Sequence, residues 1–117
     1  MEDLVTPSDI EREMVDITSR IDNAPSQLRD YHEKVRAARV SHKMAYALAY
    51  QGATGTQVDK KMQADLDTRD TLEVLDHAEV EYKFATDIFD GLRTKLRALQ
   101  SVSSLMKASM FGNHGGI

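Results

Sequence analysis

The stretch that decides the fold is Leu72–Met110, which reads LEVLDHAEVEYKFATDIFDGLRTKLRALQSVSSLMKASM. Its apolar and small residues recur at alternating intervals of three and four, the spacing that keeps side chains on one face of an α-helix. The same spacing, held over several heptads, forms the seam of a coiled coil. The stretch contains no proline, and Gly91 is its only weak helix former. It therefore predicts one long helix. The members of the stripe are Leu75, Ala78, Tyr82, Ala85, Phe89, Leu92, Leu96, Leu99, Ser103, Met106 and Met110.

The rest of the chain predicts two further helices and one sharp turn. Thr6 or Ser8 can cap a short helix over residues 8–22, and Pro25 separates it from a second helix over 25–51. Gly52 and Gly55 mark the turn before a returning helix over 56–110, followed by a flexible tail over 112–117. We expect one all-α domain over 1–111, an antiparallel helical hairpin with a long C-terminal helix plus a short N-terminal helix. The sequence leaves open whether the returning helix is straight or broken near residues 67–70.

The apolar stripe on the returning helix predicts self-association. A straight helix from residue 56 would extend about 40 Å beyond the helix that it packs against, at 1.5 Å per residue. An apolar rod of that length does not stay bare in water. We therefore expect residues 85–110 to form a homo-oligomer in coiled-coil or bundle fashion. The predicted interface residues are Phe89, Leu92, Leu96, Leu99, Val102, Leu105 and Met106.

The charges alternate in sign along the chain. Residues 1–24, 25–51, 52–90 and 91–117 carry −5, +3, −6 and +4 respectively, for a net charge of −4. Antiparallel helices with opposite charges attract each other, which is one interpretation of the blocks. The other is that residues 91–117, which contain no acid, contact an anionic partner.

Two groups of basic residues are candidates for nucleic-acid binding. Rows of Arg and Lys along a helix can neutralise phosphates without reading the base sequence. The alternative is that these residues are solvated and pair with acidic neighbours. The candidates are Arg93, Arg97, Lys95 and Lys107 in the returning helix and Arg36, Arg39 and Lys43 in the second helix.

The sequence offers no catalytic motif. Glu73 and His77 lie four residues apart, but an exposed helical pair explains that spacing without a metal, because further ligands are not evident. The chain has no cysteine, its first residues lack the pattern of a signal peptide, and its apolar run at 44–50 is too short to span a bilayer. We therefore expect a cytoplasmic non-enzyme without cofactor, metal site or membrane contact.

One arrangement of motifs resembles a group of known proteins. It comprises Tyr46-Ala47-Leu48-Ala49-Tyr50, then Ala78-Glu79-x-x-Tyr82-Lys83, and finally Leu92-Arg93-x-x-Leu96-Arg97-Ala98-Leu99-Gln100-Ser101. It resembles small helical proteins of tailed bacteriophages from the genome region for DNA replication and recombination, over roughly residues 25–105. The resemblance implies an accessory role in the cytoplasm of an infected bacterial cell. The partners that it implies are nucleic acid, with single-stranded DNA preferred, or a phage or host DNA-processing protein.

A second hypothesis needs no nucleic acid. The chain would then be a protein-binding module that offers its apolar C-terminal helix to a partner, as a phage inhibitor of a host factor or a virion assembly or scaffold component. The two hypotheses differ in their dependence on salt, since phosphate contacts weaken steeply as salt rises and apolar contacts do not.

Overall fold

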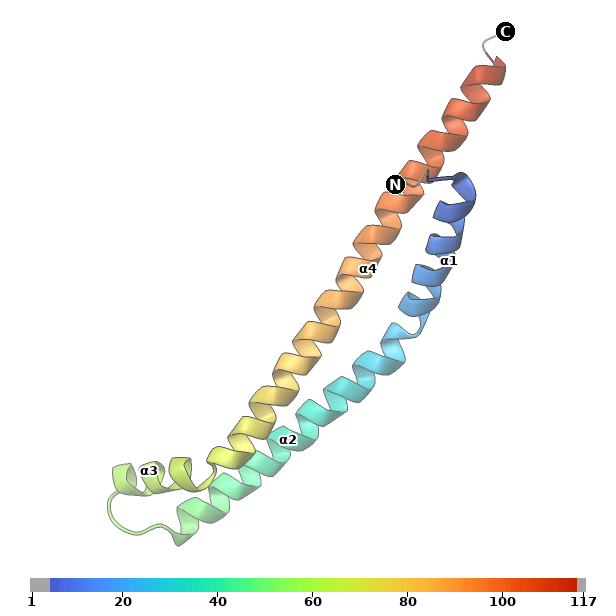
Figure 1. The fold of residues 1–117 in the computed structure, drawn as a ribbon. Helices are drawn as coiled ribbons and strands as arrows, with labels where there is room; N and C mark the ends of the chain where they lie inside the picture. Colours follow the sequence, from blue (N-terminus) through green and yellow to red (C-terminus); the bar gives the residue numbers. More distant parts are fainter. Residues whose placement is uncertain (1–4, 116–117) are drawn as a thin grey trace. The chain divides into compact units, whose positions relative to one another are not determined.

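The computed structural model describes residues 5–115, with side chains described for residues 5–110. Every regular element in this part of the chain is a helix, so the predicted all-α class is confirmed (Figure 1). The sequence-based bounds of the first two helices differ from the observed bounds by at most one residue. The helices are α1 (Pro7–Asp22), α2 (Ala24–Gly52), α3 (Gln57–Asp67) and α4 (Arg69–Gly115).

The start of α1 is fixed by a capping box. Thr6 is the N-cap: its hydroxyl oxygen accepts from the Asp9 backbone N–H at 3.2 Å, and its own N–H donates to the Asp9 carboxylate at 3.1 Å. Pro7 occupies the first helical position, where its missing N–H costs nothing. The backbone hydrogen bond from Thr6 holds the pKa of the Asp9 carboxyl below its usual value of 3.8. Of the two caps that the sequence allows, Thr6 is therefore the one used.

The turn after α2 depends on Gly55 and on a second capping box. Gly55 has a φ of +104°, and a Cβ at this position would lie 2.8 Å from the Asp59 carboxylate. The sequence suggests Gly52 as the C-terminal cap that follows the helix over 25–51. In the structure Gly52 still belongs to the helix, as the last residue of α2. Thr56 and Asp59 then repeat the reciprocal hydrogen bonds of the α1 cap and start α3.

The predicted returning helix over 56–110 is divided into α3 and α4 at Thr68. Thr68 is buried, and the Ala64 carbonyl accepts from its hydroxyl at 2.6 Å as well as from its backbone N–H at 3.1 Å; a hydroxyl bond of this kind often bends a helix. The Thr68 carbonyl accepts from the Leu72 N–H at 3.1 Å and so takes part in the start of α4. The break thus falls inside the region that the sequence left open. At its other end α4 runs to Gly115, into the predicted tail over 112–117, and residues 116–117 lie outside the described residues.

The chain divides into two compact units, where the sequence analysis expects one domain. Unit 1 comprises residues 1–25 and 87–117, and unit 2 comprises residues 26–86. In unit 1, α1 lies beside the second half of α4, and the Lys95 ammonium group pairs with the Glu13 carboxylate between them. Large apolar side chains are buried in this unit. They are Ile10, Ile17, Phe89 and Leu92.

Unit 2 is packed mainly with small residues. Val35 and Ala38 on α2 form a core with Ala78 on α4, which Leu75 and Tyr82 extend. Polar contacts join the same two helices: His42 Nδ1 lies 2.9 Å from Thr71 Oγ1, and Arg39 lies 3.8 Å from Glu79. Alanine permits close approach of helix backbones, so this unit holds its helices together with little large apolar surface.

Across the described residues, none of the helices combines the length and the apolar character that crossing a bilayer requires.

Candidate interaction surfaces

The seven predicted interface residues on α4 do not share one environment. Phe89 and Leu92 are buried inside unit 1, and Leu96, Leu99 and Met106 are partly covered. Val102 and Leu105 are 43% and 71% exposed. The reason is that α1 covers the main stripe of α4, so most of the predicted interface belongs to the core of unit 1. Of the seven predicted residues, Val102 and Leu105 are therefore the most accessible to a partner.

A second stripe of apolar and small residues remains exposed on α4 within unit 1. Its large members are Ile88, Val102 and Leu105, and beyond the chain neighbours of Gly91 no side chain lies within 4 Å of the position that a Cβ would take there. Its residues follow one another at helical intervals of three, four or seven, so they share one side of the helix. We call this stripe the outer face of α4. It comprises Ile88, Gly91, Ala98, Val102, Leu105 and Ser109. The sequence signal was present, because Ile88, Val102 and Leu105 widen the apolar stripe of the predicted helix.

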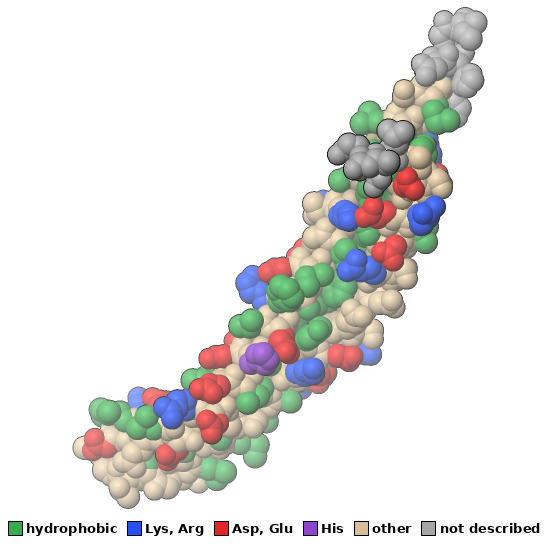
Figure 2. Space-filling model, in the orientation of Figure 1, with side chains coloured by type: hydrophobic (Ala, Val, Ile, Leu, Met, Phe, Trp, Pro, Cys, Tyr) green, Lys and Arg blue, Asp and Glu red, His purple; other side chains and the backbone are tan. Residues whose placement is uncertain are grey.

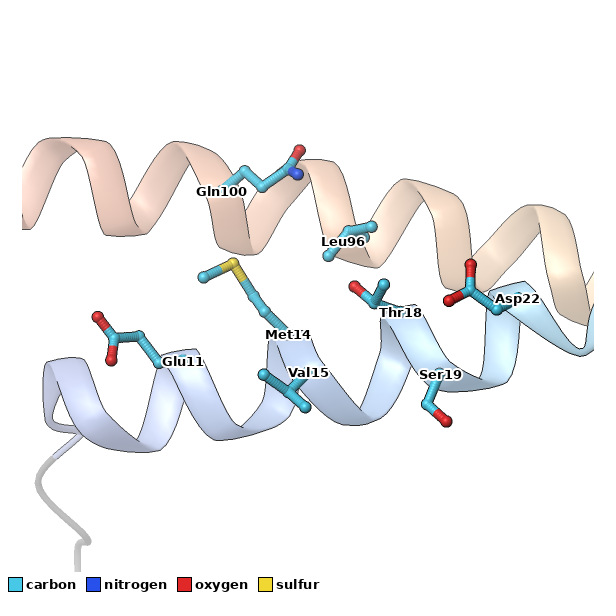
Figure 3. Close-up of a pocket in the computed structure, with 8 residues that line it drawn as sticks. All are labelled: Glu11, Met14, Val15, Thr18, Ser19, Asp22, Leu96 and Gln100. Carbon is cyan, nitrogen blue, oxygen red and sulfur yellow. The ribbon is translucent and has the colours of Figure 1, made fainter.

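An open groove lies between α1 and α4 in unit 1, with a volume of about 690 Å³. Figure 3 shows Met14 and Thr18 from α1 and Leu96 from α4 extending into the space between the two helices. Glu11 and Asp22 give the groove an acidic rim. Sequence reasoning missed this groove, because it did not predict which residues of α4 the short first helix covers.

The basic candidates on α4 divide into paired and unpaired residues. Arg93 donates to the Asp90 carboxylate at 3.0 Å, and Lys95 pairs with Glu13 on α1. Arg97 and Lys107 are exposed and form no ion pair with any other residue whose side chain is described. Two of these four cations are thus partly neutralised within unit 1.

The basic candidates on α2 show the same division. Arg36 lies 3.6 Å from Glu33 one turn away, and Arg39 pairs with Glu79 on α4. Lys43 is exposed and forms no ion pair within the described part of the chain. The structure does not bring the two basic groups together within either unit, since Arg36, Arg39 and Lys43 belong to unit 2 and the others to unit 1.

Groups suited to acid–base or metal chemistry are not gathered into a site within residues 5–110. Thr68 is the single buried polar residue there, and no cluster of three or more His, Asp or Glu side chains could hold a metal ion. His77 lies 3.0 Å from Glu81, one turn after it, and not beside Glu73 as its spacing suggested. No protein-family model, curated protein or solved structure matches this chain.

Proposed function

We propose that this chain is a non-enzymatic accessory protein that acts by binding another protein through the outer face of α4. The observation that carries the proposal is the exposure of Val102 and Leu105, from which α1 does not exclude solvent. Gly91, Ala98 and Ser109 lie on the same side, and small residues let a partner helix approach closely. The helical spacing of the residues on the outer face suits packing against an apolar helix of a partner protein.

The charges of α4 indicate what kind of partner helix suits this face. From Gly91 onward α4 carries Arg93, Lys95, Arg97 and Lys107 and no acidic residue. Arg93 and Lys95 are already paired with Asp90 and Glu13, so Arg97 and Lys107 are the cations that favour an amphipathic partner helix with acidic flanks, because its charges would be complementary. The resemblance to phage proteins suggests that this helix belongs to a phage or host protein of DNA recombination or replication, in the cytoplasm of an infected bacterium. An inhibitor of a host factor and a virion assembly component would use the same face.

Self-association belongs to the same proposal. The sequence predicts an oligomer through residues 85–110, and a second copy could place its own outer face there. In unit 2, the contacts of α2 with α4 run in opposite chain directions, with His42 beside Thr71 and His32 beside Tyr82. These contacts support an antiparallel hairpin as the scaffold.

A photoreactive residue at Leu105 tests the protein-binding function. We expect it to form crosslinks to a partner protein when the chain is expressed together with phage DNA-processing proteins. The matched control places the same group at Val80, which is similarly exposed on α4 but lies outside the outer face. Equal adducts from both positions would contradict the proposal, and adducts to the chain itself alone would assign the face to self-association.

Nucleic-acid binding is a second candidate function, which the unpaired Arg97 and Lys107 favour. Each phosphate contact adds to the slope of binding against salt, so both substitutions to Ala should lower the affinity and the slope together. Fluorescence anisotropy of labelled single- and double-stranded oligonucleotides at two salt concentrations measures this. The control is Lys95→Ala, because Lys95 already pairs with Glu13. Absence of binding at low salt would exclude direct nucleic-acid binding.

A further inference from the structure

The sequence around the break between α3 and α4 is compatible with one continuous helix, although α3 turns away from the line of α4 (Figure 1). Residues 57–71 contain neither glycine nor proline, the residues that most often end or kink a helix. The buried and half-buried side chains keep the three–four rhythm of one helix face across the break. They are Ala64, Thr68, Thr71, Leu75 and Ala78.

The break falls on the backbone of Thr68, whose φ of −108° and ψ of 16° depart from helical values. Its N–H still donates to the Ala64 carbonyl and its carbonyl accepts from the Leu72 N–H, both at 3.1 Å, as in a continuous helix. The hydroxyl bond of Thr68 recurs at Thr86 and Thr94, which lie within unbroken α4. Thr68 differs from these two in being buried. The hydroxyl bond thus selects the bend only together with the contacts that bury Thr68.

The contacts that hold α3 in its bent position are few among the described residues. Gln63 Nε2 donates to the Thr54 carbonyl at 2.8 Å, and Lys60 Nζ lies 5.9 Å from the centre of the Tyr50 ring. Ala64 is the buried residue of α3. Large apolar side chains form exposed rows on α3 and on α2, and hydrophobic side chains are visible at the surface where α3 lies (Figure 2). The rows are Val58, Met62 and Leu66 on α3 and Val40, Met44 and Leu48 on α2. Because neither row is buried, the bend rests on an exposed hydrogen bond, a cation–π contact and one alanine.

A straight α3 would meet a suitable surface on α2. Within unit 2, α2 and α4 run in opposite directions, with His42 beside Thr71. Ala64 lies seven residues before Thr71. Ala49 lies seven residues after His42 and is half-buried. The same register would therefore place the two alanines side by side, where small residues let helix backbones approach closely.

The turn between α2 and α3 is long enough for the straight form. In the same register, Gly52 at the end of α2 lies beside Lys61, four residues after the start of α3 at Gln57. Four residues rise about 6 Å along a helix, and packed helices lie about 8–10 Å apart, so the ends to be joined are about 12 Å apart. The chain from Gly52 to Gln57 reaches about 16 Å when extended. The turn can therefore join the helices without unwinding either of them.

We propose that Thr68 is a hinge at which α3 changes between the bent position and a straight one, in which α3 and α4 form a single helix. The two positions are close in free energy, since the straight form completes the helix and the bent form keeps the weak contacts of α3. The hinge sets the direction in which the row of Val58, Met62 and Leu66 faces, so a partner that binds this row in one position alone would shift the equilibrium. The hinge uses no residue of the outer face of α4 and is independent of the proposed function.

The distance across the hinge tests the proposal. The chain has no cysteine, so Val58→Cys and Val80→Cys provide two unique sites for spin labels. Both valines are exposed, at 67% and 65%, and both belong to unit 2. In a straight helix the 22 residues between them span about 33 Å, and a bend shortens that distance. Electron–electron double resonance should show a main shorter distance and a second component near the length of the straight helix.

Two substitutions should raise the fraction of the straight form. Gln63→Ala removes the bond to the Thr54 carbonyl, and Thr68→Ala places a better helix former at the hinge. Each should raise the ratio of straight to bent form about threefold, and the two together about tenfold, the scale of one exposed hydrogen bond and of that difference in helix propensity. The matched control is Thr86→Ala, which removes the same kind of hydroxyl bond outside the labelled segment and should leave the distances unchanged.

Three results would overturn the hinge. The first is a single distance, of either length, that neither substitution changes. The second is an equal response to Thr86→Ala. The third is a broad range of distances together with lower helicity by circular dichroism in the Gln63→Ala or Thr68→Ala variant, because α3 would then unfold in place of swinging.

Discussion

Units 1 and 2 bury different kinds of side chain. Unit 1 buries Ile10, Ile17, Phe89 and Leu92, whereas the buried residues of unit 2 are mostly alanines, with Val35 as its one large member among the described residues. Both units expose large apolar side chains, but unit 2 exposes more of them, including the ordered rows on α2 and α3. Burial of apolar area is the main favourable term in folding. We infer that unit 1 is stabilised chiefly from within and that unit 2 depends more on what covers it.

Removal of a large buried side chain from unit 1 should have the largest effect on stability. Ile17 is 1% exposed, so Ile17→Ala loses its transfer free energy and leaves a cavity. We expect the free energy of unfolding to fall by about 3 kcal/mol, measured by urea denaturation. The control is Val15→Ala on the same helix. Val15 is exposed, and the effect should stay within about 0.5 kcal/mol. Equal losses for both variants would contradict the role of the buried Ile17 side chain in the stability of unit 1.

Enlargement of a buried alanine in unit 2 should have a smaller effect. Ala64 is fully buried where α3 packs, and a leucine there has no space, so Ala64→Leu should destabilise the chain by about 1–3 kcal/mol. Ala108→Leu, at an exposed position of α4, is the control and should be nearly neutral. Denaturation with urea again measures the change. A stabilising effect of Ala64→Leu would mean that the small-residue packing of unit 2 leaves room for larger side chains.

Acid should loosen the first turn of α1 without large effects elsewhere. The pKa of Asp9 is lower in the folded chain than its usual value of 3.8, so its stabilisation is present above that pH and is lost as the pH falls through the lowered pKa. Hydrogen exchange of the first amides of α1 should therefore speed up below pH 3.8. Asp9→Ala should remove that dependence, whereas Asp16→Ala, at an exposed position of the same helix, should keep it. An identical acid response in both variants would assign the effect to other carboxylates.

The sequence predicts the helices well because their signals are local. The Thr6 and Thr56 capping boxes, the proline at 25 and the three–four stripe each act within a few residues. Two features depend on contacts between distant residues and could not be predicted in the same way. The sequence permits a break near 67–70, but the buried Thr68 and its bond to Ala64 decide it. The predicted interface on α4 likewise separates into core and surface because of where α1 lies.

The candidate surfaces were predicted less well than the helices. The sequence lists Lys95 and Arg39 as basic candidates, and only the structure shows that they pair with Glu13 and Glu79. The exposed row on α3 is visible in the sequence as a stripe of Val58, Met62 and Leu66, but a stripe alone does not say whether it faces inward. Residue spacing defines a face, whereas tertiary contacts decide which face is buried.

Hydrogen exchange at different protein concentrations tests the dependence of unit 2 on a partner most directly. If a second copy covers the exposed row of Val58, Met62 and Leu66, amides of α3 should gain protection as the concentration rises, since association stabilises the folded form by mass action. Amides of α1 in unit 1 should stay unchanged in the same samples. Protection of α3 that is independent of concentration, or that rises equally in α1, would contradict the account.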